Sequence, residues 1–336
     1  MTSAQYFLGV SALRGFAALL VVVQHAGYFV TMATRTAYTE VIKVDFGLIG
    51  VVMFFTISGF VIGLNRHLPS LEFAIRRAVR IYPAFWIAYA LSTLAAIAIG
   101  QPTGFKWYAA LLLPSFGYPI MQLPVWTLVF EVFFYMLATI VFGLRLSDRV
   151  LTWIVFFWFL AILGASPYTG GKLLAMPGGL IPLAQYNLFF ALGLFCALKI
   201  DLLSRASAAQ CLGVAVVAFL LLPLFPPLPH IVALVVLGIA LSAILIAATQ
   251  IDEWPRFAVR LGDASYGLFL VHFAIMMVAA DILAASVPSV WWLFAALIAT
   301  GLVIGIPLGL AEFAMHRMAL RWLLPQRSAR VPSVAR

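Results

Sequence analysis

Charged side chains are scarce in this chain of 336 residues. Lys, Arg, Asp and Glu together make up 9% of it, whereas hydrophobic residues make up 65% and the mean hydropathy is +1.11. Soluble globular domains carry about 25% charged and about 45–50% apolar residues. The shortage of charge therefore excludes a soluble protein and a disordered chain, and it predicts a protein that lies in a membrane for most of its length.

Cysteine is also scarce, because the chain has only Cys196 and Cys211, both in or beside apolar segments. Two cysteines cannot form the framework of a disulfide-stabilised scaffold, and they do not make a zinc site. No histidine-rich pattern is present either, so no metal site is predicted. We expect both thiols to pack as small apolar groups.

The alternation of apolar and polar residues that is typical of membrane β-barrels is missing. Apolar stretches are continuous instead, as in 151–163 and 231–248, which predicts an all-α, polytopic transmembrane helical bundle. Because a span needs about 20 apolar residues, we predict about ten spans. They cover 7–32, 46–65, 81–100, 122–144, 150–166, 183–198, 208–226, 230–250, 266–285 and 290–314.

The segments between the spans predict the topology. The N-terminal region lacks a basic stretch and a small-residue cleavage site, so we expect its apolar segment to remain as a membrane helix. If the N-terminus is cytoplasmic, the cytoplasmic segments hold 15 Lys and Arg residues and the opposite segments hold 4. This asymmetry predicts that both termini are cytoplasmic.

We expect one transmembrane domain over 1–315, followed by a short basic cytoplasmic tail over 316–336. The stretch 105–120 is predicted to be a re-entrant or interfacial segment before the fourth span.

Arg14 and His25 lie within the first predicted span. Their separation of eleven residues corresponds to three helical turns plus about 20°, so both lie on nearly the same face, about 16 Å apart along the axis. Ionisable residues inside a membrane are costly and commonly functional. A snorkelling arginine and a hydrogen-bonded structural histidine would also explain the pair.

Glu131 is an isolated carboxylate in the fourth predicted span, with Tyr135 one turn away. A buried carboxylate needs a cation or a proton, and His25 or an arginine is the natural partner. The pair would act in catalysis or would simply join two helices. At the start of the third span, Arg77 and Arg80 share one helical face with Arg76. Such a cluster suits phosphate groups, although cytoplasmic topology alone also accounts for it.

The last two predicted spans carry further polar residues. Ser265 and Tyr266 open the ninth span, His272 lies two turns further along, and Glu312 lies near the end of the tenth. Ser265 would serve as a helix N-cap as readily as a site residue. No nucleophile elbow is present.

In this order, the polar positions resemble the acyltransferase 3 family of membrane O-acyltransferases. The resemblance covers residues 8 to about 315 and rests on five motifs. These are Leu13-Arg14-Gly15 followed by His25-Ala26; Gly50-Val-Val-Met-Phe-Phe-Thr-Ile-Ser58-Gly59-Phe60; Arg77-x-x-Arg80-Ile-Tyr-Pro83; Trp126-Thr-Leu-x-x-Glu131-x-x-Phe-Tyr135; and Ser265-Tyr266-Gly-Leu-Phe-Leu-x-His272. The chain departs from the family where Asp or Asn often precedes the first motif, and at Val52, where a polar residue is usual.

The resemblance implies transfer of an acyl group, most often acetyl, from cytoplasmic acyl-CoA to a hydroxyl of a cell-surface or lipid-linked saccharide. It implies acyl-CoA as a co-substrate rather than a permanently bound cofactor. It also implies contact with membrane lipid, no nucleic-acid partner, and a bacterial inner membrane as the location.

The residue roles follow from the same resemblance. His25 is expected to act as the general base and Glu131 to orient its ring. Arg14, Arg77 and Arg80 are expected to bind the donor. The remaining polar side chains of the motifs are expected to contact the donor or the developing oxyanion; they are Ser58, Tyr135, Ser265, Tyr266 and His272.

Two other classes of function share some of these features. About ten spans with buried ionisable residues also fit a transporter, such as a flippase for a lipid-linked sugar or a carrier for a small solute. A structural or sensor protein would use the same polar residues for helix packing alone. Phosphate-dependent binding of acyl-CoA distinguishes the enzyme from both.

Overall fold

The computed structural model describes residues 3–101, 107–113, 125–169, 178–224, 230–287 and 289–324. In these residues the chain is helical apart from the connections between helices, without a β-strand. The elements are α1 (Ser3–Thr34), α2 (Tyr38–Val41), α3 (Phe46–Leu64), α4 (Ser70–Ala98), α5 (Trp107–Ala110), α6 (Val125–Gly143), α7 (Asp148–Thr169), the 3₁₀ helix η1 (Gly178–Leu183), α8 (Asn187–Leu198), α9 (Ile200–Leu203), α10 (Ala208–Leu224), α11 (His230–Thr249), α12 (Arg256–Leu283) and α13 (Val290–Leu323).

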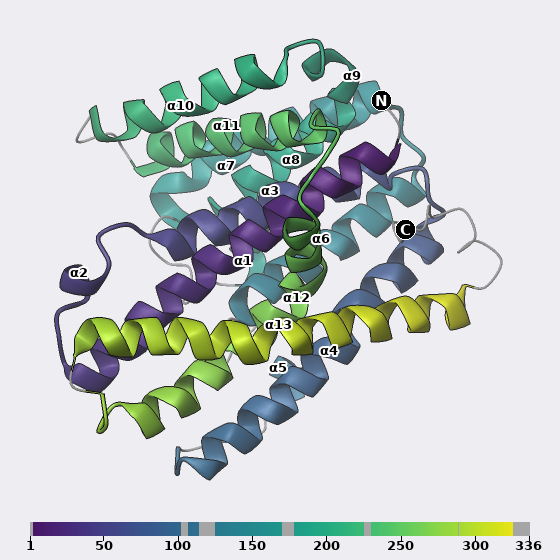
Figure 1. Ribbon diagram of the computed structural model, residues 1–336. Coiled ribbons are helices and arrows are strands. Elements are labelled where there is room, and N and C mark those ends of the chain that lie inside the picture. Colours follow the sequence, from purple (N-terminus) through teal and green to yellow (C-terminus); the bar gives the residue numbers. More distant parts are fainter. Residues whose placement is uncertain are drawn as a thin grey trace.

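The all-α membrane bundle is confirmed. Among the described residues, eight helices are long and apolar enough to cross a membrane, and two shorter apolar helices, α8 and α10, lie where spans were predicted. In Figure 1, α1 runs through the middle of the bundle, with α10 and α11 on one side of it and α4 and α13 on the other. The start of α1 and the end of α13 lie on the same side, at the right of this view.

Several helices extend beyond the predicted spans. Helix α4 begins at Ser70 rather than at 81, α12 begins at Arg256 rather than at 266, and α13 continues to Leu323. The physical reason is that hydropathy marks only the part of a helix that lies in lipid. Arginine is a good helix former, so the backbone hydrogen bonds continue through the basic turns. Residues 316–323, which were expected in the tail, are therefore helical, and 325–336 lie outside the described residues.

The segment predicted as re-entrant is described only over 107–113. It contains the single turn α5 and packs against the side of α4. The indole of Trp86 donates to the carbonyl of Ala110 at 2.8 Å, and the hydroxyl of Tyr82 donates to that of Leu111 at 3.2 Å. These contacts provide polar partners for carbonyl groups that follow a helix too short to use them.

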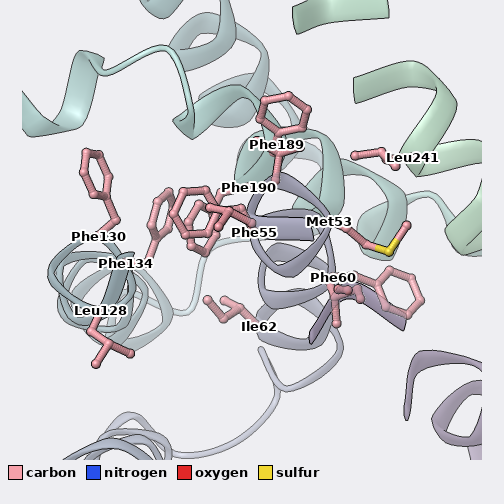
Figure 2. Close-up of a cluster of buried hydrophobic side chains, with 14 of the residues drawn as sticks. Met53, Phe55, Phe60, Ile62, Leu128, Phe130, Phe134, Phe189, Phe190 and Leu241 are labelled. Carbon is pink, nitrogen blue, oxygen red and sulfur yellow. The ribbon is translucent and has the colours of Figure 1, made fainter. Parts of the chain in front are cut away.

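The core is rich in aromatic side chains from α3, α6 and α8. Phe190 stacks on Phe134 with ring centroids 3.5 Å apart and on Phe55 at 4.7 Å, and Figure 2 shows these rings meeting between the three helices. Aromatic stacking adds about 0.5–1.5 kcal/mol per pair to the energy of burial.

Both cysteines are buried and unpaired, as expected.

Helices α3 and α8 approach each other through glycine. A methyl group on Gly193 would overlap the carbonyl oxygen of Thr56, and one on Gly59 would overlap the carbonyl of Phe190. Lipid is as apolar as the helix surfaces, so close backbone approach and dispersion, rather than the hydrophobic effect, hold membrane helices together.

Replacing Gly193 with Ala should therefore force α3 and α8 apart. We expect a loss of stability of about 1–3 kcal/mol, the usual range for overpacking, measured as a lower thermal unfolding midpoint in detergent. Gly213 in α10 is the matched control, because a methyl group there meets no atom within 4 Å. Gly213→Ala should leave stability unchanged or raise it, since Ala favours helix. Equal midpoints for the two variants would contradict this account of the contact.

Candidate active site

A small cavity lies among α1, α3, α4, α6 and α12. Its volume is about 40 Å³, room for about three water molecules. It brings together six of the ten predicted site residues from five separate helices. The lining side chains are Arg14, Val51, Phe54, Phe55, Ser58, Arg80, Thr127, Leu128, Glu131, Ser265, Tyr266 and Phe269.

Arg80 is held firmly at one wall of this cavity. Its Nη1 donates to both carboxylate oxygens of Glu312, at 3.2 and 3.4 Å, and its guanidinium lies 4.5 Å from the ring centroid of Tyr266. The two charged side chains are only 13% and 9% exposed. Glu312 was not predicted as a site residue, although an isolated carboxylate in an apolar span was a usable signal.

Glu131 reaches the cavity from α6 and accepts a hydrogen bond from the hydroxyl of Tyr135. The ring of Tyr135 lies 5.2 Å from the guanidinium of Arg77, which also lies 5.1 Å from the ring of Phe73. Tyr135 therefore connects the carboxylate in the cavity with an arginine on the outer side of α4.

The predicted pairing of Glu131 with His25 is wrong. His25 Nδ1 lies 2.8 Å from Nε2 of His272 instead. The reason is the order of the helices: a methyl group on Gly15 would lie 2.9 Å from the backbone nitrogen of Gly262, so α1 and α12 touch along their backbones. Helix α6 packs against α3 and α4, so its side chains do not face His25.

The hydrogen bonds of the histidine pair determine where its protons lie. Nδ1 of His272 is 2.9 Å from the carbonyl oxygen of Leu268, and a carbonyl only accepts, so this nitrogen carries a proton. In a neutral ring, Nε2 of His272 is then an acceptor and Nδ1 of His25 is its donor. The Nε2 atom of a neutral His25 is therefore unprotonated, as a general base requires.

Two phenyl rings separate the cavity from the histidine pair. Phe54 and Phe269 both line the cavity and meet edge to face with centroids 5.6 Å apart. The ring of Phe269 also lies 6.0 Å from that of His272. Phe269 thus contacts both the cavity and the ring of His272.

Positive charge exceeds negative charge around the cavity. Arg77 and Arg80 lie within electrostatic range of Arg14. Of the three, only Arg80 has a carboxylate within ion-pair distance in the described part of the chain. Asp263 adds a carboxylate, but Arg260 and Arg317 accompany it. Because Arg260 and Arg317 are exposed, the charges nearest the cavity are those of Arg14, Arg77 and Arg80 against Glu131 and Glu312, an excess of positive charge that attracts an anion.

The structure places the other predicted residues in different positions. Ser265 is well inside α12, where its hydroxyl donates to the carbonyl of Gly262 at 2.7 Å, so the N-cap interpretation is wrong. The hydroxyl of Tyr266 donates to the carbonyl of Ile81 at 3.2 Å. Ser58 lines the cavity and has no hydrogen-bond partner among the described residues. Arg77 faces a separate groove.

The described residues contain no group of three or more His, Cys, Asp or Glu side chains that could hold a metal ion. Two hydrogen-bond donors that line the cavity are Arg14 and Ser58. Such groups stabilise anionic substrates and developing negative charge.

Comparison with known proteins places the whole bundle in one family. The sequence profile described as an acyltransferase domain matches residues 7–310, which include all ten predicted site residues. No curated protein and no solved structure matches the chain.

Replacing Glu312 with Ala should destabilise the protein strongly. The change leaves the buried guanidinium of Arg80 without its carboxylate, and breaking a buried ion pair costs about 3–5 kcal/mol. The measurement is the thermal unfolding midpoint. Asp148→Ala is the control, because it removes the partner of Arg66 in a pair whose carboxylate side is half exposed; such pairs contribute about 0–1 kcal/mol. Similar shifts in both variants would show that Arg80 does not depend on Glu312.

Proposed function

The chain belongs to the acyltransferase 3 family, and from this premise we propose that it transfers an acyl group, most simply acetyl, from acyl-CoA to a saccharide hydroxyl. The acceptor in this proposal is a cell-surface or lipid-linked saccharide, and the membrane is a bacterial inner membrane. The observation that supports the proposal best is the cationic cavity, which lies beside a histidine whose Nε2 is free to accept a proton.

The donor would bind at the arginine-rich end of the bundle, which we assign to the cytoplasm. CoA carries several phosphate charges, and Arg14 and Arg77 have no carboxylate partner among the described residues. Guanidinium groups suit phosphate because they remain charged and present several donors in one plane. The excess of arginine over carboxylate thus supports an anionic donor.

The cavity itself is too small for the pantetheine arm of CoA. With about 40 Å³, it would admit little more than the acyl end, since drug-sized ligands occupy about 300–1,000 Å³. Binding of the thioester would therefore require a local opening. We expect this opening at the phenyl rings of Phe54 and Phe269, because both line the cavity and Phe269 also contacts His272.

The proposed reaction is a direct transfer. The acceptor oxygen forms a bond with the thioester carbonyl carbon while its proton passes to Nε2 of His25. The carbon–sulfur bond then breaks, and the CoA sulfur receives this proton from His25. His272 accepts a hydrogen bond from Nδ1 of His25, so it holds the ring in the required tautomer, a role that the aspartate plays in a Ser-His-Asp triad.

The oxyanion that forms at the carbonyl oxygen needs hydrogen-bond donors. The hydroxyls of Tyr135, Tyr266 and Ser265 already donate to other groups. Arg14 and Ser58 line the cavity, but Arg14 lies about 16 Å from His25 along α1, so we assign both side chains to the donor rather than to the oxyanion. Glu131 is then a structural acceptor for Tyr135 and a counter-charge for the arginines.

Acetyl-CoA should raise the thermal unfolding midpoint of the purified protein, because a ligand that binds the folded state stabilises it by about 2.7 kcal/mol at 100 times its dissociation constant. Dephospho-CoA should raise it less. The Arg77→Ala/Arg80→Ala variant should lose the effect, whereas Arg149→Ala/Arg205→Ala, which alters two exposed arginines, should keep it.

His25→Ala should retain the shift with acetyl-CoA and lose transfer, because it removes the base and not the donor contacts. If acetyl-CoA at millimolar concentration leaves the wild-type midpoint unchanged, the donor assignment fails. If His25→Ala transfers acyl groups normally, the base assignment fails.

His272 should act as a positioning residue. His272→Leu removes the acceptor for Nδ1 of His25, so we expect kcat to fall by about 100-fold or more with little change in KM, within the range for lost acid–base catalysis. His272→Gln places an amide oxygen near the position of Nε2 and should restore part of kcat. Steady-state kinetics of transfer measures both effects. Equal losses in the Leu and Gln variants would indicate a purely structural histidine.

A further inference from the structure

A second hollow lies on the outside of the bundle between α4 and α6. Its volume is about 360 Å³, within the usual range of ligand sites. Its wall consists of one face of each helix, with residues repeating every three or four positions. The lining residues are Ala74, Arg77, Ala78, Ile81, Tyr82, Val132, Tyr135, Met136, Thr139 and Ile140.

This groove opens toward the lipid. Met136 and Ile140, at its edge, are 62% and 63% exposed, and exposed apolar side chains on a membrane helix contact hydrocarbon. The hydroxyl of Tyr82 donates to Leu111, and that of Thr139 donates to the carbonyl of Tyr135 at 2.6 Å. The wall therefore offers apolar surface and few free polar groups.

Arg77 is the exception in this wall. Its Nε is buried and has no hydrogen-bond partner among the described residues, and no carboxylate of these residues lies within ion-pair distance. The rings of Phe73 and Tyr135 hold its guanidinium by cation–π contact, at 5.1 and 5.2 Å. A buried donor without an acceptor costs about 1–3 kcal/mol, so an anionic ligand at this point would stabilise the site.

The depth of Arg77 fits a lipid phosphate. Helix α4 has 29 residues, a length of about 43 Å, and exceeds the hydrocarbon thickness of about 30 Å. Arg77 lies seven residues after Ser70, which is about 10 Å from the helix start. This level corresponds to the boundary between the headgroups and the hydrocarbon core.

We propose that the α4–α6 groove binds one hydrocarbon chain of an anionic phospholipid, with the lipid phosphate against Arg77. The chain lies along Ala78, Ile81, Val132 and Met136. A pantetheine arm fits this wall less well, because its amide groups would find few partners there. The proposed transfer reaction does not use the apolar wall of this groove, but it shares Arg77 with the proposed donor site, so the lipid is tested without donor.

Binding of this lipid would affect the central cavity through Tyr135 and Arg77. The ring of Tyr135 forms part of the groove, and its hydroxyl donates to Glu131 in the cavity wall. The lipid phosphate would also neutralise Arg77, which lies within electrostatic range of Arg14.

The test measures lipid retention by native mass spectrometry after release from nanodiscs of equal parts phosphatidylglycerol and phosphatidylcholine, without donor or acceptor. Wild-type protein should retain one phosphatidylglycerol about fivefold in excess of phosphatidylcholine, the fold-change that corresponds to about 1 kcal/mol for one basic residue at an anionic lipid. Arg77→Gln should lose this preference.

Ala78→Trp fills the groove and should lose the retained lipid. Ala90→Trp is the matched control, because Ala90 is an exposed alanine on the same helix and does not line the groove; it should retain lipid as the wild type does. The proposal is overturned if wild type shows no preference for phosphatidylglycerol, or if Ala78→Trp retains it fully. All these outcomes leave the transfer reaction to be judged by its own assays.

Discussion

Direct contact between the backbones of α1 and α12 is the constraint on which the site depends. A methyl group on Gly262 would overlap the carbonyl of Ser11, and one on Gly15 would press on Gly262. Because these helices touch without intervening side chains, residues further along them must also meet. His25 and His272 each lie ten residues beyond the contact between Gly15 and Gly262, and they form a hydrogen bond that their positions in the sequence do not suggest.

The same constraint extends to α13. A methyl group on Gly309 would overlap the carbonyl of Ala264, two residues before Tyr266. This close approach brings Glu312 to Arg80 across three helices, α4, α12 and α13. One arginine of the cationic cluster is thus fixed by a carboxylate and an aromatic ring, whereas Arg14 and Arg77 keep their full charge for other partners. The small residues determine which charges are neutralised and which remain.

The sequence alone was enough to predict the membrane bundle, because continuous apolar runs have one structural solution in lipid. Arg14, Ser58, Arg80 and Glu131 were predicted as site residues, Ser58 through the resemblance to the family alone, and all four line one cavity. The partner of His25 could not be predicted, because helical periodicity gives the face of a residue but not the neighbouring helix. Glu312 was not predicted for the same reason, because its role depends on its ion pair with Arg80, which is 232 positions away in the chain. The ends of α4 and α12 were misjudged because hydropathy measures lipid contact rather than helix formation.

The phenyl pair Phe54–Phe269 has a consequence beyond substrate access. Arginines, carboxylates and histidines aligned through a bilayer are the elements of a proton wire, and a cell that maintains a membrane potential cannot tolerate a continuous one. Two apolar rings in contact interrupt any file of water between the cavity and the histidines. The protein can therefore keep ionisable groups on both sides of this barrier without making the membrane leak protons.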